Sequence, residues 1–247
     1  MNKTITTLLL LFVFTLSFGQ KEYYELRTYT IPFFSDAQPL HDYLSDALLP
    51  ALNRQGIENI GVFKPLGDEH PQRIVLLIPY KSMASYESTL AALKKDATFQ
   101  EDRKEYDQVP ASNPSYGRFS SSFYIAFDGL PQIVKPEKGT QLFELRTYEG
   151  YSEDAVRRKI KMFNKEELSI FDQTGLHSVF FGEQVSGPLM PALTYMLSFQ
   201  SMEERDANWE KFAVHPEWKR ISVLPEYANS VSDIKRTFLQ ALDYSQL

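Results

Sequence analysis

The pentapeptide Glu-Leu-Arg-Thr-Tyr occurs twice in this chain, at residues 25–29 and 144–148. If each copy is a strand, its glutamate, arginine and tyrosine share one face, because side chains alternate across a strand. These three side chains can pair with one another as a structural hydrogen-bond network, or they can line a ligand cleft. The sequence leaves both roles open, because structural ion pairs resemble functional sites. The candidate ligand-binding residues are therefore Arg27, Tyr29, Arg146 and Tyr148.

Histidine offers the next candidate. The four histidines show neither metal-ligand spacing nor an accompanying metalloprotease motif, so no metal site is expected: His41, His70, His177 and His215. His177 lies on a predicted strand with Val179 and Phe181 as face-mates, and it could be a general base, a haem ligand or a satisfied structural histidine. It is the weak catalytic candidate and joins the candidate ligand-binding residues. No cofactor is predicted, and haem is the only cofactor considered.

Composition excludes several other kinds of chemistry. The chain has no cysteine, which excludes disulfides, thiolate metal sites and a cysteine nucleophile. It contains no Gly-x-Ser-x-Gly elbow, phosphate-binding loop or dinucleotide fingerprint.

Residues 1–19 are typical of a secretory signal, with Lys3 before an apolar run and small residues before Gln20. An uncleaved anchor is the alternative, but the run is shorter than the roughly 20 residues of a spanning helix. We expect cleavage, export to the periplasm or the medium, and no stable membrane insertion afterwards. The mature chain would carry 25 basic and 32 acidic side chains, a net charge of −7 that disfavours nucleic-acid partners.

The repeat extends beyond the pentapeptide. At the same offset of 119 residues Gly56 matches Gly175, Ser82 matches Ser201, and Phe99 matches Trp218. Near the end the offset drops to 115, pairing Val109-Pro110 with Leu224-Pro225, which requires a four-residue deletion in one loop. The chain therefore holds two copies of one unit.

Hydrophobic periodicity and turn residues predict the same element order in both copies. The first has strands at 21–31, 57–66, 73–80 and 117–127, with helices at 37–55 and from Ser82 toward 95. The second has strands at 141–149, 176–185, 193–199 and 231–242, with helices capped by Ser152 and Ser201. Each copy is thus a ferredoxin-like β-α-β-β-α-β unit of the α+β class.

We predict a first domain at 20–128, a linker rich in glycine and proline at 129–140, and a second domain at 141–247. One such unit leaves a sheet face in water, so the two copies should pack sheet to sheet as a pseudo-symmetric pair. The more apolar set, Tyr24, Leu26 and Thr28, is expected under the helices. Glu25, Arg27 and Tyr29 would then point between the sheets.

Four stretches resemble the NIPSNAP family: residues 24–29, 143–148, 199–209 and 212–218. The resemblance implies two tandem ferredoxin-like repeats packed as an intrachain dimeric α/β barrel. It attaches no reaction to the chain, although the wider barrel class includes small monooxygenases and haem-degrading enzymes. Tyr86 and Leu90 of the first copy stand where the second has Arg205 and Trp209, so a site using these positions would exist in one half only.

The leading hypothesis is an exported protein that binds a small organic ligand in the inter-sheet cleft, with cofactor-free oxygenase-like or isomerase-like chemistry as a further step. The competing hypothesis is a non-enzymatic interaction or scaffold protein whose polar interface is purely structural. Oligomerisation stays open, because the duplication already provides internally what a single-copy relative would obtain by dimerising.

Overall fold

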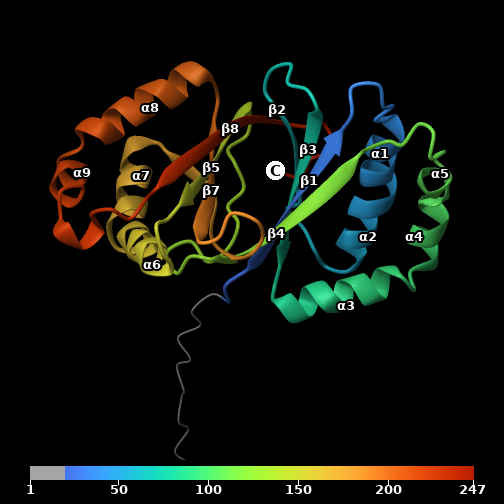
Figure 1. The fold of residues 1–247 in the computed structure, drawn as a ribbon, viewed down its shortest axis with the longest axis horizontal. Coiled ribbons are helices and arrows are strands. Elements are labelled where there is room, and N and C mark those ends of the chain that lie inside the picture. The colour runs from blue at the N-terminus through green and yellow to red at the C-terminus, as the bar shows by residue number, and fades with distance from the viewer. Residues whose placement is uncertain (1–19) are drawn as a thin grey trace, which may run out of the picture.

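Residues 20–247 form two copies of one β-α-β-β-α-β unit in the computed structural model (Figure 1). The expected signal at residues 1–19 lies outside these described residues, so export stays a prediction. No helix in the described range is long and apolar enough to cross a bilayer. The first unit contains β1 (Tyr23–Ile31), α1 (Gln38–Asp42), η1 (Tyr43–Leu48), α2 (Leu49–Arg54), β2 (Gly61–Pro65), β3 (Gln72–Tyr80), α3 (Met83–Leu93), α4 (Ala97–Asp102), α5 (Lys104–Asp107) and β4 (Arg118–Ala126).

The second unit repeats this order and begins after the predicted linker. It contains β5 (Leu142–Glu149), α6 (Glu153–Met162), η2 (Phe163–Glu167), α7 (Leu168–Thr174), β6 (His177–Ser186), β7 (Ala192–Phe199), α8 (Met202–Val214), α9 (Pro216–Ile221), η3 (Pro225–Tyr227) and β8 (Asp233–Ala241).

Serine caps start the helices where the sequence predicts them. The hydroxyls of Ser82, Ser152 and Ser201 accept hydrogen bonds from backbone amides three residues later, at 3.0, 3.2 and 3.3 Å. The long helix of each unit ends before a glycine in the left-handed conformation, at Gly56 and Gly175. These caps fix the helix positions on each sheet.

The long helix of each unit is interrupted by one π-helical turn, η1 or η2. The two turns occupy equivalent positions of the repeat, where the sequence predicts unbroken helix. A π turn inserts one residue into the helical period, and such turns are frequent at functional sites.

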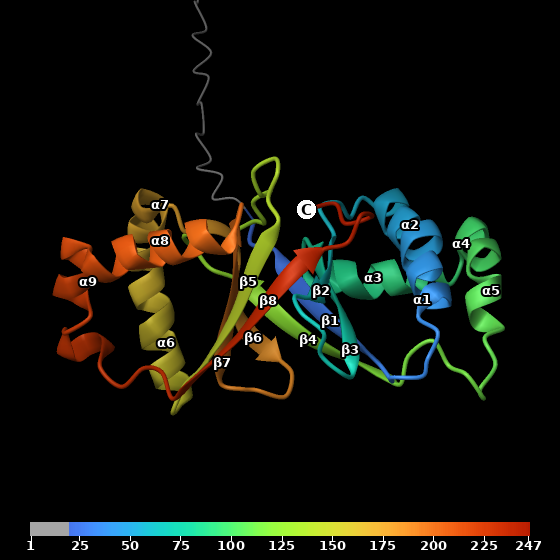
Figure 2. The same ribbon diagram turned by 90° about the horizontal axis from the view of Figure 1, so that it is seen from above.

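The eight strands close into one barrel in the order β1-β3-β2-β8-β5-β7-β6-β4. Every pair is antiparallel, and the units join where β2 pairs with β8 and β4 pairs with β6. The helices of each unit cover the outside of its own sheet, so the strands lie between two helical layers (Figure 2). The predicted α+β fold, an intrachain dimeric α/β barrel, is confirmed.

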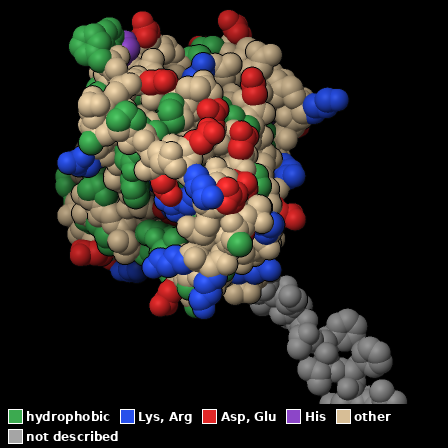
Figure 3. Space-filling model, turned by 90° about the vertical axis from the view of Figure 1, so that its right-hand side faces the viewer, with side chains coloured by type: hydrophobic (Ala, Val, Ile, Leu, Met, Phe, Trp, Pro, Cys, Tyr) green, Lys and Arg blue, Asp and Glu red, His purple; other side chains and the backbone are tan. Residues whose placement is uncertain are grey.

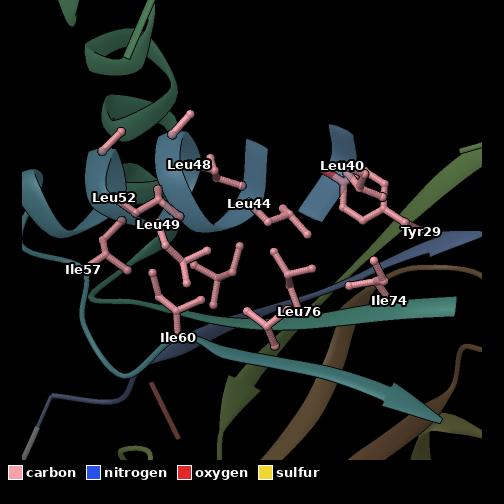
Figure 4. Close-up of a cluster of buried hydrophobic side chains, with 14 of the residues drawn as sticks. Tyr29, Leu40, Leu44, Leu48, Leu49, Leu52, Ile57, Ile60, Ile74 and Leu76 are labelled. Carbon is pink, nitrogen blue, oxygen red and sulfur yellow. The ribbon is translucent and has the colours of Figure 1, made fainter. Parts of the chain in front are cut away.

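Two hydrophobic cores lie between helices and sheet, one in each unit, and a third fills the barrel. In the first unit Tyr29 and Ile74 pack under Leu40 and Leu44 of the long helix (Figure 4). The barrel interior instead holds side chains from both units, all nearly inaccessible to solvent: Tyr24, Phe63, Val75, Leu77, Tyr124, Ala126, Phe143, Val179, Phe180, Met196 and Leu239.

The predicted orientation of the repeated motif is therefore wrong. Tyr24 and Leu26 face the barrel interior, whereas Glu25 and Tyr29 face the helices. The hydrophobic cluster of the barrel interior consists of neutral side chains. The charged side chains of the motif lie on the helical side, where each has a partner, as Arg27 has in Glu25.

Candidate functional site

In the second unit, a fully buried carboxylate collects an unusual number of donors. Glu144, on β5, is inaccessible to solvent. It accepts hydrogen bonds from Arg146 Nε at 2.7 Å and from Trp209 Nε1 at 2.9 Å. Arg205 of α8 binds both its oxygens, through Nε and Nη2 at 2.9 Å each. Arg236 Nε of β8 lies 4.0 Å from Glu144 Oε1.

Aromatic rings hold these arginines in place. The guanidinium of Arg146 lies 3.9 Å from the ring centroid of Trp209. Those of Arg205 and Arg236 lie 5.5 and 5.1 Å from the ring of Phe238. A cation over an aromatic face is attracted by the ring quadrupole, most strongly where water is excluded. We call Glu144, Arg146, Arg205, Trp209, Arg236 and Phe238 the arginine cluster.

The arginine cluster carries more positive charge than its buried carboxylate needs. Three guanidiniums surround Glu144, and the second carboxylate in contact is that of Asp206, half exposed, on Arg205 Nη1. Burial alone would raise the pKa of Glu144, but the hydrogen bonds and charges of Arg205 and Arg146 outweigh it and hold that pKa below its ordinary value. The side chain of Arg236 makes no hydrogen bond to any of residues 20–247, and its nearest carboxylate contact is the 4.0 Å approach to Glu144. One cation in the cluster is left with unused donors.

The first unit contains a smaller, balanced version of this network. Arg27 binds both oxygens of Glu25, at 2.8 and 3.1 Å. The hydroxyls of Tyr80 and Ser121 complete the carboxylate's partners. Here one carboxylate meets one cation, and hydroxyls supply the rest. The extra arginines are specific to the second unit.

A second set of polar side chains adjoins the arginine cluster. The hydroxyl of Tyr195 donates to that of Tyr148 at 2.9 Å, and Arg146 Nη1 reaches the Tyr148 oxygen at 3.4 Å. Burial raises the pKa of Tyr195 well above its ordinary value, so this phenol stays neutral. Lys159 and Glu167 form a buried ion pair in the same layer, across the π turn η2.

The structure thus places the candidate ligand-binding residues in two separate networks, one in each unit. Arg146 and Tyr148 belong to the second-unit network, while Arg27 and Tyr29 lie in the equivalent layer of the first unit. Sequence reasoning did not select Arg236, nor Arg205 as a binding residue. Comparison of the two copies contains a signal for both arginines, because the first copy has Tyr86 and Ser121 at the equivalent positions.

His177 lies apart from both networks. A β-bulge between Ser178 and Phe180 breaks the strand alternation, so the expected face-mates of His177 lie on opposite faces of the sheet, Val179 toward the barrel interior and Phe181 toward the helices. Its side chain is 41% exposed, with Nε2 3.9 Å from Glu204 Oε1. It lines a cleft of about 390 Å³ beside the linker.

The cleft beside His177 has a mixed lining. Apolar side chains such as Leu168 and Leu176 stand there with the charged Asp172, Lys135 and Glu137. No three acidic or histidine side chains converge as metal ligands anywhere in residues 20–247. A role for His177 in general-base catalysis stays a prediction.

Solved structures share this fold at low sequence identity. A candidate monooxygenase from Fusobacterium nucleatum matches with a TM-score of 0.54 and 10% identity, covering 90% of this chain and 93% of that one. A second, from Lactobacillus acidophilus, gives a TM-score of 0.56 at 10% identity and covers 90% of this chain and 94% of its own. At such identity the likeness establishes the architecture alone.

Smaller structures match less than half of the chain. A NIPSNAP domain protein from Burkholderia xenovorans is 22% identical, covers 41% of this chain and 95% of its own, and has a TM-score of 0.36. No curated protein matches the chain. The sequence model of the NIPSNAP family matches twice, at residues 24–111 and 143–246, which together exceed half of the chain. The protein therefore belongs to the NIPSNAP family, with one family domain in each unit of its barrel.

Proposed function

We propose that the second unit binds a small organic anion, a carboxylate with an apolar body, at the arginine cluster. One observation carries the proposal: three guanidiniums gather around a single buried carboxylate. A buried carboxylate needs one good cation and a few donors, as Glu25 shows in the first unit. The further cations of the second unit are explained by an anion that comes from outside.

The position of Arg236 supports this proposal. Its side chain is 48% exposed, and its planar fork of donors matches a carboxylate, whose two oxygens accept parallel hydrogen bonds. Trp209 and Phe238, both partly buried, offer apolar surface beside it for the body of the ligand. The inter-sheet cleft is the weaker location, because apolar side chains fill the barrel interior.

Catalysis at the arginine cluster is a further hypothesis beyond ligand binding. The hydrogen-bonded hydroxyls of Tyr148 and Tyr195 adjoin the cluster and could take part in proton transfer, and Arg146 connects them to Glu144. Oxygenase-like or isomerase-like activity without a cofactor would have to act through these groups.

Calorimetric titration with cyclohexanecarboxylate tests the proposal. The mature wild-type protein should bind it saturably, and Arg236→Gln should weaken binding about tenfold, the effect of losing a charge-assisted hydrogen bond. Arg220→Gln is the matched control, because Arg220 is similarly exposed at 50% but is already paired with Glu217 and Glu166. Its affinity should equal that of the wild type.

Absence of saturable binding, or equal affinity in the two variants, would overturn the proposal and leave the arginines with a structural role. That outcome favours the second candidate function, an interaction protein. Its supporting observation is an exposed aromatic tip in the first unit, where Phe33 and Phe34 are 66% and 91% exposed. Hydrophobic side chains project from this side of the molecule beside a histidine (Figure 3), consistent with the contact of Phe33 with His70.

A further inference from the structure

A separate cleft of about 570 Å³ opens in the first unit, between α5 and the start of β4. Its volume lies in the range of small-molecule sites. Its lining includes Tyr106 of α5, Tyr116 and Phe119 near the start of β4, and the connecting loop with Val109 and Pro110. None of its lining residues belongs to the arginine cluster.

The cleft arises where the two copies differ in length. The first copy has four more residues than the second between Phe99 and Val109, and the four-residue helix α5 lies in this interval. Tyr106 is part of α5. The additional helix therefore supplies one wall, and the second unit has no counterpart of it. Insertions that add a loop to a rigid scaffold are a common source of binding sites.

Aromatic packing holds the walls rigid. Tyr106 stacks on Tyr43 of the π turn η1, with ring centroids 4.1 Å apart and planes 11° from parallel. Tyr116 meets Tyr29 edge to face at 5.1 Å. Phe119 is 51% exposed, so its ring is available to a ligand. Preformed aromatic walls lose little conformational entropy on binding.

Of the two arginines that line the cleft, one is paired with a carboxylate. Arg103 donates to both oxygens of Asp107, at 2.9 and 2.7 Å. Arg118 donates to the carbonyl of Gly117 at 2.7 Å. The buried hydroxyl of Ser115, a lining residue, has no hydrogen-bond partner among residues 20–247. The cleft thus combines aromatic side chains with tyrosine and serine hydroxyls and an internally paired Arg103 and Asp107, while Arg118 binds only a backbone carbonyl among residues 20–247.

From this geometry we infer that the cleft binds a neutral planar aromatic molecule of one or two fused rings bearing a hydroxyl group. The rings stack or pack edge-on against Phe119 and Tyr116, which gives each pair an attraction beyond the area it buries. The hydroxyl exchanges hydrogen bonds with the tyrosine hydroxyls at the wall. This site is independent of the proposed anion site in the other unit.

Titration of the full mature protein with 2-naphthol, followed by calorimetry, tests the inference. Wild type should bind saturably, and Phe119→Ala should weaken binding about tenfold through loss of aromatic contact. Phe34→Ala is the control, since Phe34 is a more exposed aromatic residue that does not line the cleft, and this variant should bind like wild type. Ala111→Trp, at an exposed lining position, should fill the cleft and abolish binding while Phe119 itself is unchanged.

Comparing a planar ligand with a non-planar one gives a further test. The saturated analogue 2-decalol keeps the hydroxyl but loses the planar rings, so it should bind about tenfold more weakly than 2-naphthol. Arg236→Gln should leave 2-naphthol binding unchanged, which separates this inference from the anion site. The inference is overturned if 2-naphthol does not saturate, if 2-decalol binds equally well, or if neither Phe119→Ala nor Ala111→Trp weakens binding.

Discussion

The side chains of Lys159 and Glu167 form an ion pair that is almost inaccessible to water, 7% and 3% exposed. The ammonium lies 4.6 Å from the ring centroid of Phe163. Burial raises the pKa of Glu167, and Lys159 offsets that rise only in part. In the first unit Leu40 and Leu48 occupy the equivalent positions, fully or almost fully buried. The fold therefore does not require charge at this place.

We expect the two single replacements to be costly and the double replacement to be mild. Lys159→Leu leaves a buried carboxylate without its cation, which should lower the free energy of unfolding by about 3–5 kcal/mol. Lys159→Leu combined with Glu167→Leu reproduces the pair of the first unit and should fall within about 1–2 kcal/mol of wild type or exceed it. Urea denaturation followed by circular dichroism measures the wild type, the two single variants and the double variant. A double variant as unstable as the single one would contradict the argument.

The arginine cluster could be predicted from the sequence only in part. Strand alternation correctly places Glu144 and Arg146 on one face, as their hydrogen bond confirms. It cannot tell which face lies under the helices when both carry apolar residues, so the motif was oriented the wrong way. Arg205 and Arg236 come from elements some 60 and 90 residues away from the motif, and only the closed sheet brings them to Glu144.

At the scale of elements, the glycines that end the long helices provide a matched comparison. Gly56 and Gly175 have nearly the same backbone conformation, with φ of +75° and +74°. A Cβ at Gly56 would meet nothing within 4 Å, whereas one at Gly175 would lie 2.9 Å from Nδ2 of Asn208. That buried amide donates to the Gly175 carbonyl and connects α8 to the end of α7.

Gly56→Ala should therefore cost only the left-handed conformation, about 1–2 kcal/mol. Gly175→Ala should cost about 1–3 kcal/mol more, because the amide of Asn208 is displaced from its partner. Thermal unfolding of the two variants under one set of conditions measures the difference. Equal losses would show that Asn208 moves aside without cost.

The elements themselves were predictable because their signals are local. Serine caps, terminal glycines and alternating apolar residues each act within a few positions, and the repeat supplied every signal twice. The π turns and the bulge in β6 were not predictable in this way. Each inserts a single residue without a distinct residue type, so hydrophobic periodicity on either side looks unbroken.

At the scale of the whole molecule, the two units share one barrel and one interior. Phe63 of the first unit meets Phe143 of the second with ring centroids 4.8 Å apart, and Tyr24 meets Phe180 at 5.2 Å. The edges of each four-stranded sheet are hydrogen-bonded to the other unit. An isolated unit would expose both edges and an apolar sheet face, which are the features that drive association.

The predicted linker at 129–140 should accordingly be dispensable once the chain has folded. Its first part is anchored, since Val134 N donates to the Val179 carbonyl and Ile133 N to Glu22, whereas Lys138 and Gly139 are exposed. A specific protease site inserted after Lys138 should be cut without separating the halves. Size-exclusion chromatography of the nicked protein should give one peak at the position of the uncut protein.

Denaturation should behave differently after the cut. Joining the units in one chain makes their association intramolecular, so the uncut protein should unfold at a urea concentration that does not depend on protein concentration. The nicked protein should unfold at lower urea, with a midpoint that rises as protein concentration rises, because its halves dissociate on unfolding. Fragments that elute separately before any urea is added would mean that the strand pairs β2–β8 and β4–β6, together with the shared interior, hold the barrel only while the linker is intact.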